Sequence, residues 1–146
     1  MLDRLLLPCC YFMTISPPLR TFQVDALWVE VYRQEVDLVS NLVRATQFYL
    51  SEVMERQGTA AAILASGASQ IRLLKDLTTF GEIDWGRLTL FHLDEYLGIG
   101  DKHPASFGLF MRESVERQVT VRKFNYLAGD TAEPIAECDQ IGRAHV

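Results

Sequence analysis

Basic residues, cysteines and long apolar runs are all scarce in this sequence of 146 residues. Lys and Arg number 14 against 19 Asp and Glu, a formal charge of −5 that argues against a broad surface for nucleic acid or an anionic membrane. No run of about 18 apolar residues occurs, so we expect no membrane-spanning helix. Hydrophobic residues still make up 49% of the chain, which is enough for a buried core and excludes intrinsic disorder.

The three cysteines, Cys9, Cys10 and Cys138, are too few for a disulfide framework and lack the paired spacing of a zinc site. We therefore expect reduced thiols and a cytoplasmic protein. The apolar start is a poor signal peptide, because Pro8 interrupts it and no small-residue cleavage site follows.

Both ends of the chain look foreign to a folded domain. Residues 1–12 have neither helical nor strand periodicity, and Met13 opens a polar, proline-bearing stretch. We therefore expect residues 1–20 to be a leader outside the domain, with Met13 as the true start of translation. Residues 141–146 (IGRAHV) look like one reading frame of a DNA-sequencing adapter. On that hypothesis, residues 21–140 are the N-terminal part of a longer domain and the last six residues are an artefact.

Between these ends the hydrophobic period switches repeatedly between strand and helix. Strands are expected at residues 27–32, 60–65, 88–93 and 124–127. Helices are expected at residues 36–57, 70–80 and 105–117 and from residue 134 onward. The run AAAILA at 60–65 suits a strand buried on both faces, and Gly58 stands where a helix needs a left-handed C-cap. This alternation predicts an α/β fold, a Rossmann-like parallel sheet with flanking helices.

Ligands of parallel sheets bind beyond the carboxyl ends of the strands, and this rule singles out two loops. The first follows the strand at 60–65 and reads SGASQ. Its small residues let backbone N–H groups approach an anion at a helix N-terminus, which suits a sugar phosphate. The loop has neither a Walker lysine nor a G-x-G-x-x-G pattern, and Ser69 is equally explained as the N-cap of the next helix.

The second loop follows the strand at 88–93 and begins with two adjacent carboxylates, Asp94 and Glu95. Partial withdrawal from water at the strand end would suit one of them to work as a general base. The plainer alternative is that both carboxylates cap or solvate a turn. In the same way, His92 is explained as a core histidine, His103 as a loop residue and Ser106 as a helix cap.

The second loop also carries a resemblance to a known family. Residues 91–98 (FHLDEYLG) followed by residues 103–107 (HPASF) resemble the glucosamine-6-phosphate deaminase (isomerase) family, whose pattern is D-E-Y-x-G and then H-P-x-S-[YF]. Residues 65–70 (ASGASQ) are similar to the phosphate loop of a subgroup of that family, and residues 83–88 (IDWGRL) are also similar. The resemblance covers roughly Phe22 to Gln140.

The resemblance implies an enzyme that converts glucosamine 6-phosphate and water to fructose 6-phosphate and ammonia without a metal or redox cofactor. It implies that Asp94 is the general base that moves a proton between C2 and C1 of the opened sugar, with Glu95 as its catalytic neighbour. The substrate-binding residues that it implies are Ser66, Gly67, Ala68 and Ser69 for the phosphate, and Tyr96 and His103 beside the sugar.

Two departures from the family pattern stand out. The commoner family loop has Thr-Pro where this chain has Ser69-Gln70. The family's second catalytic block, D-G-H-x-A-F-N-E, lies downstream of the residues present here. We therefore expect the fold to be truncated at its C-terminus, the 146-residue chain to be inactive by itself and an apolar sheet edge to be uncovered.

Other functions remain open at this point. A 6-phosphogluconolactonase-type hydrolase shares the fold, but its strand end usually reads D-E-R, so Tyr96 argues against it. A sugar-sensing domain would bind a sugar phosphate without turnover, yet the leader before Thr21 has no room for a DNA-binding region. A catalytically lapsed relative is a third alternative. On every reading the expected partner is a small-molecule sugar phosphate, with no nucleic acid and no membrane, and a homo-oligomer is possible.

Overall fold

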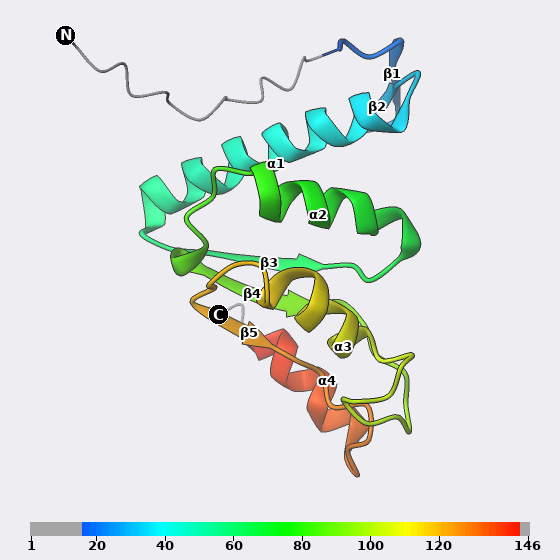
Figure 1. Cartoon of the computed structure of the whole chain (residues 1–146), viewed down its shortest axis with the longest axis vertical. Helices are drawn as coiled ribbons and strands as arrows, with labels where there is room; N and C mark the ends of the chain where they lie inside the picture. The colour runs from blue at the N-terminus through cyan, green and yellow to red at the C-terminus, as the bar shows by residue number, and fades with distance from the viewer. Residues whose placement is uncertain (1–15, 144–146) are drawn as a thin grey trace, which may run out of the picture. The chain divides into compact units, whose positions relative to one another are not determined.

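The computed structural model describes residues 16–143 (Figure 1). The chain divides into two compact units, one up to Asn41 and one from Leu42 onward, and the boundary falls inside helix α1 (Glu35–Gln57). Most of the expected leader lies outside the described residues, and so do its Met13 start, Cys9 and Cys10. Residues 144–146 of the expected artefact also lie outside them.

The first unit contains a β-hairpin that the sequence did not predict. Strand β1 (Arg20–Val24) pairs antiparallel with β2 (Leu27–Val31) across a turn at Asp25, whose φ is 51°. The expectation that the strand at 27–32 joins the parallel sheet is therefore wrong. The reason is local: a two-residue turn directs the chain back on itself, so β2 pairs with its immediate neighbour. Strand β1 also begins one residue inside the expected leader.

The second unit is built on a parallel sheet in the order β3 (Ala60–Leu64), β4 (Leu88–His92) and β5 (Lys123–Asn125). The central strand β4 is the core of this unit, and four of its five side chains are buried. This arrangement confirms the α/β fold with a parallel sheet. Within residues 16–143, no helix is long and apolar enough to cross a membrane.

The helices follow the expected positions closely. Helix α1 ends at Gln57 and is closed by Gly58, which has a φ of 82° and donates its N–H to the Met54 carbonyl at 2.9 Å. This confirms the left-handed cap. The remaining helices are α2 (Ile71–Phe80), α3 (Phe107–Met111), which continues as a π-helical turn (Arg112–Glu116), and α4 (Pro134–Arg143). Helix α3 packs against β4, and α2 packs against the π-helical turn (Figure 1).

Strand β3 differs from the expectation that it is buried on both faces. Ala61 and Ile63 are exposed, and 43% of the Ile63 surface remains open. Within the described residues β3 pairs with β4 on one side only, so its other edge lacks a neighbouring strand. A hollow of about 620 Å³, lined mainly by apolar residues, follows β3 beside α1 and α2. We call this hollow the β3 groove.

Candidate functional site

The two candidate loops begin side by side at the carboxyl ends of strands β3 and β4. Leu64 and His92 are register partners at the ends of β3 and β4, and the Leu93 N–H donates to the Leu64 carbonyl at 2.9 Å just beyond them. Ser66 and Asp94 each lie two residues past this register pair. The structure therefore brings together the starts of the two loops that the strand-end rule singled out.

The first loop carries a buried hydroxyl without a hydrogen-bond partner, that of Ser66. Gly67, Ala68 and Ser69 are exposed, and residues 68–70 form a 3-10 turn ahead of α2. Ser69 is therefore not the N-cap of α2, because that helix begins only at Ile71 and no side chain caps either segment. A buried donor at a helix N-terminus is a feature that a polar ligand can satisfy.

Asp94 lines a hollow of about 460 Å³ at the carboxyl end of β4. The walls of this hollow, which we call the Asp94 hollow, are residues 93–95 and Leu97, the segment Leu127–Gly129 and one face of α4. The Asp94 side chain is exposed, so the expectation that it is withdrawn from water is wrong for this chain. The physical reason is that the segments lining the hollow leave the Asp94 side chain in contact with solvent. The residues that line this hollow do not include Ser66–Ser69.

Glu95 has a different environment from its neighbour, because its carboxylate accepts four hydrogen bonds, three of them from residues at the start of α3. The donors are the Ser106 hydroxyl at 2.7 Å and the N–H groups of Gly108 at 2.9 Å, Phe107 at 3.0 Å and Tyr96 at 3.0 Å. Burial raises the pKa of Glu95, but the hydrogen bonds outweigh burial, and the net result is a pKa below the usual range. Glu95 is thus engaged in holding α3.

Ser106 caps α3, as the plainer interpretation of the sequence predicted. Its hydroxyl accepts a 3.1 Å hydrogen bond from the Leu109 N–H while it donates to Glu95. Capping by a serine side chain satisfies an N–H group that the first turn of a helix leaves without an intrahelical partner.

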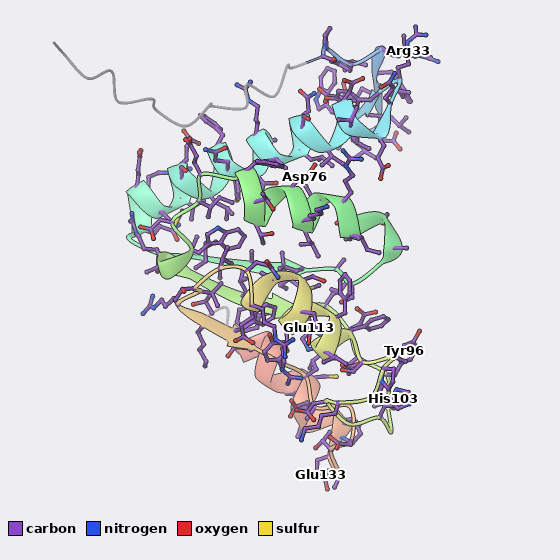
Figure 2. All side chains as sticks on the ribbon, viewed as in Figure 1. Arg33, Asp76, Tyr96, His103, Glu113 and Glu133 are labelled. Carbon is purple, nitrogen blue, oxygen red and sulfur yellow. The ribbon has the colours of Figure 1, made fainter. Side chains whose placement is uncertain are left out.

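Tyr96 and His103 both lie on the loop between β4 and α3 (Figure 2). The Tyr96 ring packs on the Phe107 ring with 4.8 Å between centroids, and 54% of its surface is exposed. His103 is exposed, and its Nδ1 accepts a 3.1 Å hydrogen bond from the Ala105 N–H. Neither residue lines the Asp94 hollow. Their contacts with a substrate stay predictions.

Sequence reasoning missed the third wall of the site, the segment Leu127–Gly129. This segment follows the carboxyl end of β5, which lies beside the carboxyl end of β4. The strand-end rule would have found the segment if it had also been applied to β5. Gly129 is buried, and its carbonyl accepts a 2.7 Å hydrogen bond from the Gly98 N–H. Among groups of His, Cys, Asp and Glu in residues 16–143, none is arranged to hold a metal ion.

No family model matches the chain, but curated proteins do. The glucosamine-6-phosphate deaminase of Cellvibrio japonicus is 36% identical over 80 residues, which cover 51% of this chain and 30% of that protein. Glucosamine-6-phosphate deaminase 2 of Bacillus subtilis is 29% identical over 102 residues, which cover 66% of this chain and 41% of that protein. This chain therefore spans well under half the length of these relatives, and the resemblance to their family is confirmed.

Solved structures show the same fold. A 6-phosphogluconolactonase from Shewanella baltica superposes with a TM-score of 0.67 at 21% identity, covering 77% of this chain and 48% of that one. A monomeric glucosamine-6-phosphate deaminase, described as a missing link of the NagB superfamily, superposes with a TM-score of 0.64 at 18% identity, covering 76% and 46%. At this level of identity the likeness establishes the fold.

Proposed function

We propose that this chain forms the substrate-binding end of a glucosamine-6-phosphate deaminase, with Asp94 as its general base. The observation that carries the proposal is the different engagement of two adjacent carboxylates. Glu95 is occupied by donors at the start of α3, whereas the Asp94 side chain is exposed and lines the hollow at the end of β4. The D-E-Y block and the relatives named glucosamine-6-phosphate deaminase support the same assignment.

The chemistry asks for a base that can both accept and release a proton. In the opened sugar, the base removes the proton from C2 while the C1 aldehyde oxygen takes up a proton, which gives an enol that carries the amine. A proton is then delivered to C1 and the nitrogen gives up a proton, so that the C2 amine becomes an imine and C1 carries a hydroxyl. Water adds to that imine, and ammonia leaves to give the ketose. A carboxylate at the mouth of a hollow suits this transfer, since general-base catalysis needs the group within hydrogen-bond reach of the reacting carbon's proton.

We assign the phosphate of the substrate to Ser66–Ser69. Neighbouring strands lie about 4.8 Å apart, so loops that begin at the ends of β3 and β4 are within reach of one hexose phosphate. The buried Ser66 hydroxyl and the start of α2 offer hydrogen-bond donors to an anion there. The cytoplasmic location, the absence of a cofactor and assembly into a homo-oligomer stay predictions.

A binding experiment tests the phosphate assignment. Calorimetric titration with glucosamine 6-phosphate and with glucosamine should give at least about tenfold weaker binding without the phosphate, because each charge-assisted hydrogen bond contributes about 1.5–3 kcal/mol. Ser66→Ala should weaken binding of the phosphorylated sugar. Ser51→Ala on α1 is the matched control and should leave binding unchanged. Equal affinities for the two sugars would contradict the assignment.

A 6-phosphogluconolactonase-type hydrolase is the second candidate, because a solved structure of that activity superposes with a TM-score of 0.67. Product analysis on the longest chain that the gene encodes separates the candidates. Ammonia release from glucosamine 6-phosphate supports the deaminase. Hydrolysis of 6-phosphogluconolactone without ammonia release supports the hydrolase. Binding of sugar phosphate without either product identifies a sensor.

A further inference from the structure

The histidine that ends β4 has no role in the proposed chemistry, yet its ring connects two parts of the site. His92 is fully buried, and its Nε2 accepts a 2.8 Å hydrogen bond from the Leu127 N–H, two residues beyond β5. A ring nitrogen that accepts a hydrogen bond carries no proton, so the ring proton must lie on Nδ1. This hydrogen bond therefore exists only while the imidazole is unprotonated.

The segment that His92 holds is a wall of the Asp94 hollow. Leu127 and Gly129 both line the hollow, and the Gly98 N–H donates to the Gly129 carbonyl at 2.7 Å. Gly129 also lies so close to residues 96–99 that a Cβ added there would be 2.3 Å from the Tyr96 carbonyl oxygen. The wall is thus held from β4 by His92 and from the segment after Asp94 by Gly98.

The groups around the imidazole ring of His92 determine the pH at which it takes up a proton. Burial lowers the pKa of His92, and this effect outweighs the opposing interactions with the nearby Glu95 and Asp94, while Arg112 acts in the same direction as burial. On its remaining side the ring faces Tyr126, with 5.5 Å between centroids. The backbone of Asp94 also interacts with the ring, and the hydrogen bond that reaches the segment after β5 is the one made by Nε2.

We infer that His92 is a positioning residue of the Asp94 site, whose unprotonated Nε2 fixes the wall Leu127–Gly129 and whose protonation at acid pH releases it. The inference rests on the proposed function for the use made of the hollow, whereas the hydrogen bond can be tested without a substrate. Protonation turns Nε2 into a donor that faces the Leu127 N–H, and two donors cannot bond to each other.

The sign of the pH dependence follows from the depressed pKa. The unfolded chain binds a proton at His92 near the ordinary value of 6.5, while the folded chain resists it. The contribution of His92 to stability is therefore complete above the ordinary value, and it is lost as the pH falls from there towards the folded-state pKa.

Nuclear magnetic resonance of the 146-residue chain tests the hydrogen bond directly. The ¹⁵N shifts of the His92 ring should identify the Nδ1–H tautomer at neutral pH. As the pH falls from neutral to below the ordinary titration range of histidine, the exchange protection factor of the Leu127 amide should fall by about tenfold or more, over the same interval in which the ring ¹⁵N shifts report protonation of His92. The Leu93 amide, bonded to the Leu64 carbonyl, is the matched control and should keep its protection factor. An Nε2–H tautomer, or a Leu127 protection factor that ignores the titration of His92, would overturn the inference.

Two variants separate positioning from simple space-filling. His92→Gln supplies a side-chain carbonyl oxygen that accepts a hydrogen bond but does not titrate, so Leu127 should stay protected at every pH. His92→Phe fills the same space without an acceptor, so Leu127 should lose protection at neutral pH. If the Phe variant fails to fold, the Gln variant still decides, because a pH response that survives in it contradicts the role of His92.

The pH dependence of ligand binding then tests the positioning role of His92 separately from the proposed function. The phosphate itself titrates near pH 6, so binding of glucosamine 6-phosphate should weaken at acid pH in both proteins, and His92→Gln gives the size of that effect. The unsubstituted chain should lose more affinity at acid pH than His92→Gln does. Binding with identical pH dependence in the two proteins would overturn the positioning role and leave the proposed function intact. No binding at any pH would defeat the proposed function, while the tautomer and exchange results would still report on the hydrogen bond.

Discussion

Asp94 and Glu95 are adjacent carboxylates with different partners. Both Glu95 oxygens accept hydrogen bonds from α3, whose Phe107 and Gly108 donors lie 12 and 13 residues further along the chain. Asp94 is exposed at the end of β4. The sequence predicted that the pair was functional but could not divide the roles, because the groups that occupy Glu95 reach it only through the fold.

Substitution of each carboxylate by its amide should separate the two roles. Asp94→Asn removes the basic lone pair and should lower the rate of ammonia release by about 10²–10⁴-fold with little change in binding or stability. Glu95→Gln places an NH₂ group against N–H donors, so it should lower the free energy of unfolding by about 1.5–3 kcal/mol for each charge-assisted hydrogen bond lost. Rates and urea denaturation of both variants check this. A mild Asp94→Asn beside an inactive but stable Glu95→Gln would transfer the base to Glu95.

At the scale of elements, local sequence signals predicted whether a segment is a helix or a strand better than they predicted which strands pair with each other. The spacing of apolar residues gave α1, and Gly58 marked its end, because both depend on neighbours within a few residues. The strand character of β2 was also correct, but its pairing with β1 depends on the turn at Asp25, where the sequence carries no Asn-Gly or Asp-Gly signal.

The loops at the strand ends show the same limit. The strand-end rule located Ser66 and Asp94, because it needs only the order of strands and helices. It could not give the packing of Gly129 beneath the Tyr96 carbonyl oxygen, since that contact joins two loops far apart in the sequence. Nor could it reveal the Nε2 hydrogen bond of His92, which is what distinguishes this histidine from a merely buried one.

Gly129 offers a test of how tightly these loops interlock. In Gly129→Ala the new Cβ would lie 2.3 Å from the Tyr96 carbonyl oxygen and 2.8 Å from that of Ile99, so backbone must move. Overpacking of this kind costs about 1–3 kcal/mol, and we expect a loss of that size in urea denaturation together with faster exchange of the Gly98 amide. Gly86→Ala is the matched control, because its Cβ would meet only the Asp84 carboxylate at 3.5 Å, an ordinary contact. Equal stability of the two variants would show that the loops are not interlocked.

At the scale of the whole molecule, the second unit presents an apolar edge. The run AAAIL is typical of a strand with neighbours on both faces, and composition cannot tell whether those neighbours are present. In the described residues the cover of β3 is incomplete: Ile63 is 43% exposed, and the β3 groove opens beside it. A strand edge with unpaired backbone groups and exposed apolar side chains is a surface prone to association.

The chain should therefore self-associate through β3. Ile63→Lys places a charge on this edge, where it opposes strand pairing and apolar contact, so association should weaken while the sheet order stays the same. Ile71→Lys is the matched control, because Ile71 is 54% exposed on α2 and lies outside the lining of the β3 groove. Sedimentation velocity over a concentration series should show association for the unsubstituted chain and for Ile71→Lys, and a shift towards monomer for Ile63→Lys. If Ile71→Lys reduces association as much as Ile63→Lys does, then net charge governs it and the exposed edge of β3 does not.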